Sequence, residues 1–244
     1  MSLFLGIDFG TTGVRTSIID KNKKELINFS VSIDSPISKG ALVYQHPSLW
    51  WSALIKNLTF LKTKIGLNKI DRLSIDGTSG TVLITDHFGN PLDNALMYND
   101  ASAVKESKLV DSISDDHPIV SNSTNALVRA LSLINKLKKE KYRILHQADW
   151  IACKIINDYL YSDENNALKL GYDCVERSWP KWFDQLPIEM NSLPNIKKPG
   201  QSIGELRNSE LIDLGFSNKT KVIAGTTDSI AAFLATGALS LIHI

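Results

Sequence analysis

Two short segments of the chain place Gly-Thr-Thr next to an aspartate, one near each end of the sequence. Residues 8–13 read DFGTTG, and residues 225–229 read GTTDS. Glycine lets backbone amides of a tight turn point at one oxyanion, and threonine hydroxyls add further donors. An aspartate beside such a turn could hold Mg²⁺ or accept a proton from a hydroxyl. The pair therefore indicates phosphate chemistry, with a turn that happens to recur as the alternative.

The first segment lies between two runs of strand-forming residues, so it is predicted to be the turn of a β-hairpin. Asp8 ends the first strand and could hold Mg²⁺ through water. Turn aspartates also often accept hydrogen bonds from nearby amides, and residue types alone leave the two interpretations equally open. The groups that could bind a phosphate are the amides, hydroxyls and guanidinium of Gly10, Thr11, Thr12 and Arg15.

The second segment runs from a predicted strand into a predicted helix, with Asp228 at the helix start. A carboxylate there stabilises the helix N-terminus by about 0.3 to 2 kcal/mol, which is one sufficient reason for it. The functional alternative is a general base that takes the proton of a substrate hydroxyl as this hydroxyl attacks a phosphoryl group.

A third polar segment, IDGTSGT at residues 75–81, lies between a strand and a predicted hairpin. Thr78 and Ser79 could donate hydrogen bonds to a polyol and accept them from it. A polar turn without a ligand is the alternative interpretation.

Composition limits the classes of partner. The 27 Lys and Arg residues nearly balance the 26 Asp and Glu residues, for a net charge of +1. This balance argues against nucleic acid or an anionic membrane as the main partner. The beginning of the chain lacks the features of a signal peptide, and no apolar run approaches the ~20 residues of a membrane span. The chain has two cysteines without paired spacing, which favours reduced thiols over a disulfide. We therefore expect a cytoplasmic protein without a zinc site.

Hydrophobic periodicity predicts strands that precede and alternate with helices, which favours a mixed sheet with packed helices over a doubly wound parallel sheet. Residues 162–200 are rich in Asn, Pro and Trp and are expected to be irregular. A strand pair is expected around the Gly-Asn-Pro turn of residues 81–98. The other predicted strands cover residues 3–8, 14–20, 25–33, 70–76 and 220–225, and the helices 48–65, 125–139, 148–158 and 228–239.

These three segments, in this order and spacing, resemble the N-terminal half of the FGGY carbohydrate kinases. Similar stretches include QHPSLWW, VLITDHFGNPLDNALMYND and KVIAGTTDSIAAFLATGA, so the resemblance runs from about residue 3 to 238. It implies an α/β, ribonuclease H-like (actin-type) domain with a mixed sheet and flanking helices. Residues 1–238 are then the sugar-binding N-terminal domain. Residues 239–244 are expected to be a truncated end, with a second actin-type domain absent and the chain inactive alone.

The resemblance also implies a reaction, the Mg²⁺-dependent transfer of the ATP γ-phosphoryl group to a sugar hydroxyl. Asp228 matches the family's general base, and Asp8 the acidic residue near the metal and phosphates. The nucleotide phosphates would be bound by Gly10, Thr11, Thr12, Arg15 and Thr227, and the sugar by Thr78, Ser79, Asp100 and Asp228.

The sequence departs from the xylulose kinases at one informative place. Those enzymes carry Met-His where this chain has Thr78 and Ser79. The DGTSGT and GTTDS segments of this chain look more like those of the ketopentose kinases of cyanobacteria and plants. This resemblance implies D-ribulose as substrate, with D-xylulose second and sedoheptulose, a seven-carbon ketose, third. The alternatives from other classes are an actin-type chaperone ATPase, which lacks the DGTSGTVL segment, and a sugar-binding module without catalysis.

Overall fold

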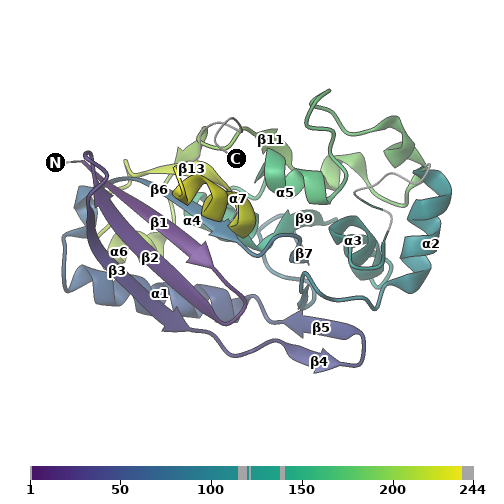
Figure 1. The fold of residues 1–244 in the computed structure, drawn as a ribbon, viewed down its shortest axis with the longest axis horizontal. Coiled ribbons are helices and arrows are strands. Elements are labelled where there is room, and N and C mark those ends of the chain that lie inside the picture. Colours follow the sequence, from purple (N-terminus) through teal and green to yellow (C-terminus); the bar gives the residue numbers. More distant parts are fainter. Residues whose placement is uncertain (1, 115–119, 121, 138–140, 238–244) are drawn as a thin grey trace.

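The computed structural model describes residues 2–114, 120, 122–137 and 141–237. The described chain forms two lobes side by side, each built on its own sheet (Figure 1). One hydrophobic core lies under the first sheet and a second lies under the other. The predicted end segment, residues 239–244, lies outside the described residues.

The first lobe holds a six-stranded mixed sheet in the order β12-β13-β6-β1-β2-β3. Strands β1, β6 and β13 are parallel, whereas β2, β3 and β12 pair antiparallel with their neighbours. The prediction of a mixed sheet is thus confirmed. The strands are β1 (Leu3–Phe9), β2 (Gly13–Asp20), β3 (Glu25–Ser32), β6 (Ile70–Gly77), β12 (Ser202–Glu205) and β13 (Lys221–Thr227).

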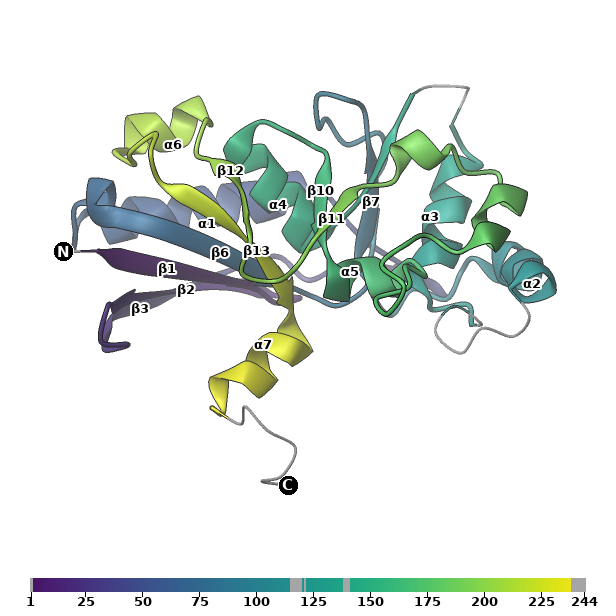
Figure 2. The ribbon, with the colours of Figure 1, turned by 90° about the horizontal axis from the view of Figure 1, so that it is seen from above.

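Helices cover the two faces of this sheet unequally. Helices α1 (Ser48–Lys62), α4 (Gln147–Ile156) and α6 (Ser209–Leu214) lie on one side, and α7 (Asp228–Ala235) projects from the other (Figure 2). Alternation along β1 buries Leu3, Leu5 and Ile7, while the residues between them point to the open face. Asp8 near the end of β1 and Asp76 near the end of β6 are therefore partly exposed on that face, whereas Thr226 and Thr227 at the end of β13 are buried.

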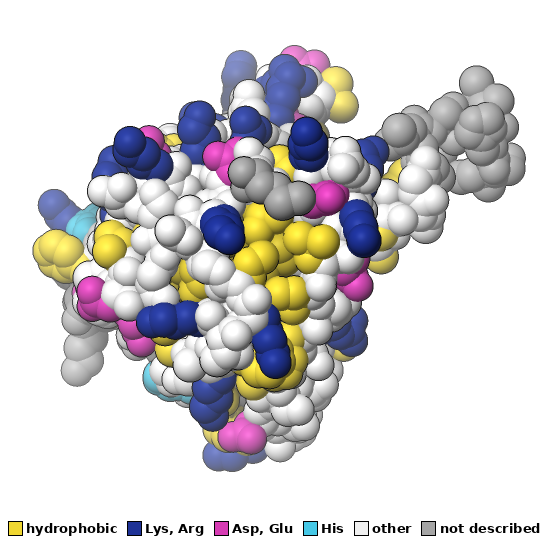
Figure 3. All heavy atoms as spheres, turned by 90° about the vertical axis from the view of Figure 1, so that its left-hand side faces the viewer, with side chains coloured by type: hydrophobic (Ala, Val, Ile, Leu, Met, Phe, Trp, Pro, Cys, Tyr) yellow, Lys and Arg dark blue, Asp and Glu magenta, His cyan; other side chains and the backbone are white. Residues whose placement is uncertain are grey.

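The open side remains partly apolar. No residue of α7 is buried, and its Ile230, Phe233 and Leu234 side chains are exposed. Hydrophobic side chains also gather at the centre of the end of the molecule shown in Figure 3, between Lys and Arg side chains. These surfaces lie on the lobe that carries the predicted phosphate and base segments.

The second lobe holds a five-stranded antiparallel sheet in the order β4-β5-β8-β7-β9. Helix α3 (Ala126–Ile134) packs on β7, and α2 (Val104–Ile113) packs on α3. Strand β9 runs directly into α4 of the first lobe, which joins the two sheets. The strands are β4 (Ile37–Lys39), β5 (Leu42–Gln45), β7 (Val82–Thr85), β8 (Ala95–Leu96) and β9 (Arg143–His146).

Several predicted elements need correction. The helix expected over 125–139 ends at Ile134, and residues 138–140 lie outside the described residues. Strands β7 and β8 share only the Val82–Leu96 pair, because a long loop replaces most of the expected hairpin. The stretch expected to be irregular contains β10 (Tyr161–Asp163), α5 (Glu164–Lys169), η2 (Lys181–Gln185), η3 (Met190–Ser192) and β11 (Asn195–Lys197); a further short helix is η1 (Leu67–Lys69).

Two negative predictions can be compared with the described residues. Across the ranges given above, no helix combines the length and apolar character that a membrane crossing needs. Both cysteines are free thiols, but only Cys153 is buried, since Cys174 is partly exposed.

Candidate active site

Three aspartates converge where the parallel strands end. Asp8 lies on β1 and Asp76 on β6, and the two are direct neighbours in the strand register. Asp228 follows β13 immediately, and Thr226 of β13 pairs with Asp76. All three aspartates line one open hollow together with Gly10, Arg15 and alanines of α7. The structure thus brings the predicted metal residue and the predicted base to the same edge of the sheet.

Asp76 is the member of this group that sequence reasoning missed. Burial, the negative charge of Asp8, a hydrogen bond to Asp8 and the charge of Asp228 together raise the pKa of Asp76 to about 8, with burial the largest cause. Negative charge is therefore crowded at this edge. The sequence feature that could have identified Asp76 is its position at the end of a predicted strand, two residues before Thr78.

The hairpin tip provides the predicted phosphate-binding groups, with one exception. The Gly10 amide donates to the Gly13 carbonyl at 2.9 Å, so it is occupied within the turn. The hydroxyls of Thr11 and Thr12 have no hydrogen-bond partner in the part of the chain that the structure describes. Gly10 therefore shapes the turn, and the two threonines present donors at its tip.

Arg15 lies across the hairpin from Asp8. Its Nη1 is 3.4 Å from Asp8 Oδ2, and the two side chains are 74% and 37% exposed. An exposed ion pair of this length contributes little to stability, about 0 to 1 kcal/mol. The guanidinium can consequently exchange Asp8 for a ligand oxygen at small cost.

Asp228 combines a structural contact with an available oxygen. Its Oδ1 accepts a hydrogen bond from the Ser229 amide at 2.7 Å, which helps to begin α7. Among the described residues, no hydrogen bond occupies Oδ2. The helix-start and general-base interpretations are therefore compatible. Thr227 is buried, and its hydroxyl lies 3.4 Å from that of Ser229.

Gly225 sets how closely β13 approaches β6. A Cβ atom at this position would lie 1.7 Å from the carbonyl oxygen of Ile75, which no relaxation of a side chain could relieve. The strand register shifts at the same place, between Ile223 and Thr226. This close approach brings Asp228 next to Asp76.

The segment predicted to contact the sugar is held by a chain of hydrogen bonds. The Gln147 Oε1 atom can only accept, so the Thr78 hydroxyl donates to it at 2.9 Å and the Thr81 hydroxyl donates to Thr78 at 2.6 Å. The Tyr98 amide in turn donates to Thr81. Thr78 is buried and its donor is used, whereas Ser79 is half-buried with no hydroxyl partner among the described residues.

Asp100 is not presented to the hollow. It is completely buried, and its Oδ2 accepts from the Val43 amide at 2.6 Å. Its Oδ1 accepts from the amide and hydroxyl of Ser102 at 3.1 and 2.9 Å. These contacts fix the loop after β8, and the sugar contact expected of Asp100 stays a prediction.

The residues present fit a magnesium ion only in part. Within the described ranges, no three His, Cys, Asp or Glu side chains form a group that could hold a metal. Mg²⁺, however, usually binds one or two carboxylates and takes its other ligands from phosphates and water. The crowded Asp8 and Asp76 carboxyl groups match that requirement, and a cation there would offset their negative charge.

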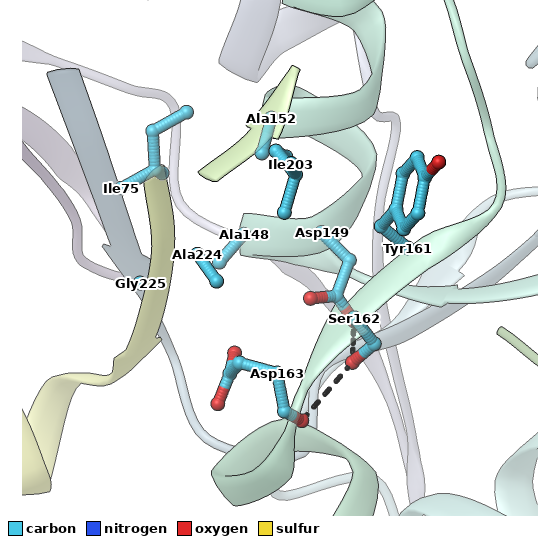
Figure 4. Close-up of a pocket in the computed structure, with 10 residues that line it drawn as sticks. All are labelled: Ile75, Ala148, Asp149, Ala152, Tyr161, Ser162, Asp163, Ile203, Ala224 and Gly225. Carbon is cyan, nitrogen blue, oxygen red and sulfur yellow. Dashed lines mark hydrogen bonds between the residues drawn. The ribbon is translucent and has the colours of Figure 1, made fainter. Parts of the chain in front are cut away.

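A separate enclosed pocket lies between α4, β10 and β13 (Figure 4). Ser162 donates to Asp149 Oδ2 at 2.7 Å within it. Burial, and then the charge of Asp149, raise the pKa of the neighbouring Asp163 to about 7. The cavity measures about 10 Å³, which admits one water molecule and excludes a sugar.

The mixed sheet, with the hairpin of β1 and β2 at one side and an aspartate directly after β13, is the α/β fold expected of an actin-type domain. The N-terminal domain of the FGGY family of carbohydrate kinases matches residues 3–235, and the chain belongs to this family. The chain is 21% identical over 247 residues to the xylulose kinase of Staphylococcus xylosus, covering 97% of this chain and 51% of that protein.

Solved structures support the same fold. The xylulose kinase from Rhodospirillum rubrum superposes with a TM-score of 0.88 at 17% identity, over 98% of this chain and 51% of that one. The glycerol kinase from Plasmodium falciparum, solved with ADP, gives 0.86 at 18% identity, over 98% and 51%. The chain spans about half the length of the curated relatives it matches.

Proposed function

We propose that these residues form the sugar-side half of a kinase that transfers the γ-phosphoryl group of ATP to a hydroxyl of a ketose. The observation that carries the proposal is the convergence of Asp228, Asp8 and Arg15 on one hollow, which Gly10 of the hairpin also lines. A base, a cation-binding carboxylate and phosphate donors are the parts that phosphoryl transfer requires.

Asp228 has the role of general base in this mechanism. Its Oδ2 accepts the proton of the attacking hydroxyl, while the Ser229 amide holds Oδ1 and fixes the side chain. Arg15 and the Thr11 and Thr12 hydroxyls bind oxygens of the transferred phosphate. Asp8, with Asp76 beside it, would hold Mg²⁺, which neutralises charge that develops on the phosphate oxygens when it is bound.

Ser79 is the better candidate of the two for the sugar contact, because the Thr78 hydroxyl already donates to Gln147. Small hydroxyl residues in place of the Met-His pair of the xylulose kinases leave room for the ketose, and the Ser79 hydroxyl offers both a donor and an acceptor. On this ground we propose D-ribulose as the substrate. D-Xylulose is the second candidate, because several curated relatives at 21 to 23% identity are named xylulose kinases.

The test compares kcat/KM for D-ribulose, D-xylulose and sedoheptulose, using a protein that also carries the second actin-type domain expected of an FGGY kinase (the partner half). A preference for D-ribulose supports the assignment, and a clear preference for D-xylulose replaces it. Asp228→Asn should lower kcat by about 10²-fold or more and leave sugar affinity within about twofold. Asp213→Asn, an exposed aspartate on α6, is the matched control.

A sugar-binding module without catalysis is the competing function. Calorimetry on the chain with D-ribulose and with ATP, each alone, measures binding, and turnover then separates the two cases. Sugar binding together with the Asp228→Asn effect on turnover supports the kinase. Sugar binding with no turnover in the protein that includes the partner half supports the module.

A further inference from the structure

Arg129 is a buried cation in the second lobe. It lies on α3, is only 1% exposed, and is among the largest fully buried side chains of the described chain. Burial lowers the pKa of Arg129 to about 10, and the negative charge of Asp100 opposes that shift. A buried guanidinium is costly unless it is hydrogen-bonded. Both terminal nitrogens of Arg129 donate hydrogen bonds, whereas its Nε has no partner among the described residues. The contacts of the two terminal nitrogens therefore identify what Arg129 holds.

The guanidinium donates to backbone carbonyls from three separate loops. Its Nη1 reaches the carbonyl oxygens of Tyr98 at 2.9 Å and Asp100 at 3.2 Å, and it also contacts that of Thr124. Its Nη2 reaches the carbonyl oxygen of Gly80 at 2.6 Å. The guanidinium of Arg129 therefore connects the segment before β7, the loop after β8 and the start of α3 through hydrogen bonds.

Gly80 shows how closely this group fits. Its φ of +85° favours glycine, and a Cβ atom there would lie 3.1 Å from Arg129 Nη2. On the other side of Ser79, the amide of Thr78 donates to Gln147 at 3.0 Å. Ser79 is thus fixed from both sides, by Gln147 before it and by Arg129 after it.

We propose that Arg129 is a positioning residue for sugar recognition, holding the backbone around Ser79 through the Gly80 carbonyl without touching the sugar. Asp100 supports it, since it supplies a carbonyl acceptor and the nearby negative charge. The proposal rests on the proposed function, because it takes Ser79 as a sugar contact. It also gives Asp100 a role that its complete burial allows.

The test uses Arg129→Lys in the chain, with the exposed Arg207→Lys as matched control. An ammonium cannot reach all of these carbonyls at once. Hydrogen exchange should become faster at amides of residues 79–81 and 98–101, and stay unchanged at residues 9–13 and 225–229. Calorimetry should show D-ribulose affinity weakened about tenfold, because a displaced Ser79 would lose its hydrogen bond to the sugar.

The outcomes are separable. Unchanged exchange at both loops overturns the positioning role, and so does faster exchange with sugar affinity kept within twofold. If the unsubstituted chain binds no ketose, the proposed function fails and the sugar-recognition role fails with it, while the exchange data still report whether Arg129 holds the loops. Should Arg129→Lys fail to fold by circular dichroism, Gly80→Ala displaces Nη2 and must give the same local exchange pattern and affinity loss.

Discussion

Asp8 and Asp76 lie side by side on parallel strands, and Arg15 lies beside Asp8 on the antiparallel strand β2, on the same face of the sheet. One cation thus faces two carboxyl groups, and Asp228 adds a third aspartate nearby. The site has an excess of negative charge before any ligand binds. We therefore expect a cation that arrives with the ligand to bind between these side chains.

Replacing Asp76 should stabilise the fold. Asp76→Asn removes a partly buried acid from beside Asp8, and we expect the free energy of unfolding at pH 8 to rise by about 1 kcal/mol or more. Urea unfolding followed by circular dichroism measures the change. Asp71→Asn, an exposed aspartate on the same strand, should give no comparable gain. A loss of stability in Asp76→Asn would show that its hydrogen bonds outweigh the charge repulsion.

Arg15 should matter for ligand binding and hardly for folding. Its exposed ion pair with Asp8 contributes at most about 1 kcal/mol, so Arg15→Ala should unfold at nearly the same urea concentration. In a protein that includes the partner half, KM for ATP should rise about tenfold, since a charge-assisted contact to phosphate is lost. Arg72→Ala, also exposed, is the control. An unchanged KM for ATP would remove Arg15 from the phosphate site.

Gly225 should tolerate no side chain. In Gly225→Ala the new methyl group would overlap the Ile75 carbonyl, and separating β13 from β6 should cost about 3 kcal/mol. The matched change is Gly204→Ala on β12, where the new atom would meet only Ile156 at ordinary contact distances of 3.4 to 3.5 Å. Thermal unfolding of both variants compares them directly. Equal stability would mean that β13 can shift without loss.

The buried pair Asp149 and Asp163 predicts a pH dependence of stability. The pKa of Asp163 is about 7 in the folded chain and 3.8 ordinarily, so between these values the folded state binds the proton more tightly. Unfolding then releases a proton, and stability falls as pH rises from about 4 to 7. Asp163→Asn should make this part of the curve shallower in urea unfolding between pH 4.5 and 8, and the slope that remains is due to Asp76, whose pKa is raised in the same way. Asp213→Asn should leave the slope unchanged, and an equally steep slope in Asp163→Asn would contradict the assignment.

Local patterns were enough to predict the hairpin of β1 and β2, because its strands and its turn are contiguous in sequence. Asp76 was missed because its partner Asp8 is adjacent only through the parallel pairing of β1 and β6, which no local pattern reveals. Thr78 could not be recognised as a structural residue for the same reason, since Gln147 and Thr81 occupy its hydroxyl only in the folded chain. Helix α5 was missed because it is short and polar, and the Asp163 side chain starts it by accepting from two backbone amides.

Gln147 has a mechanical consequence. It is the first residue of α4, where the second lobe passes into the first, and its amide donates to Thr81 while its side chain accepts from Thr78. These hydrogen bonds connect the two lobes directly next to the segment around Ser79, so we expect little hinge motion at this junction. If the proposed function holds, closure over a bound sugar would have to move the two lobes of this chain together.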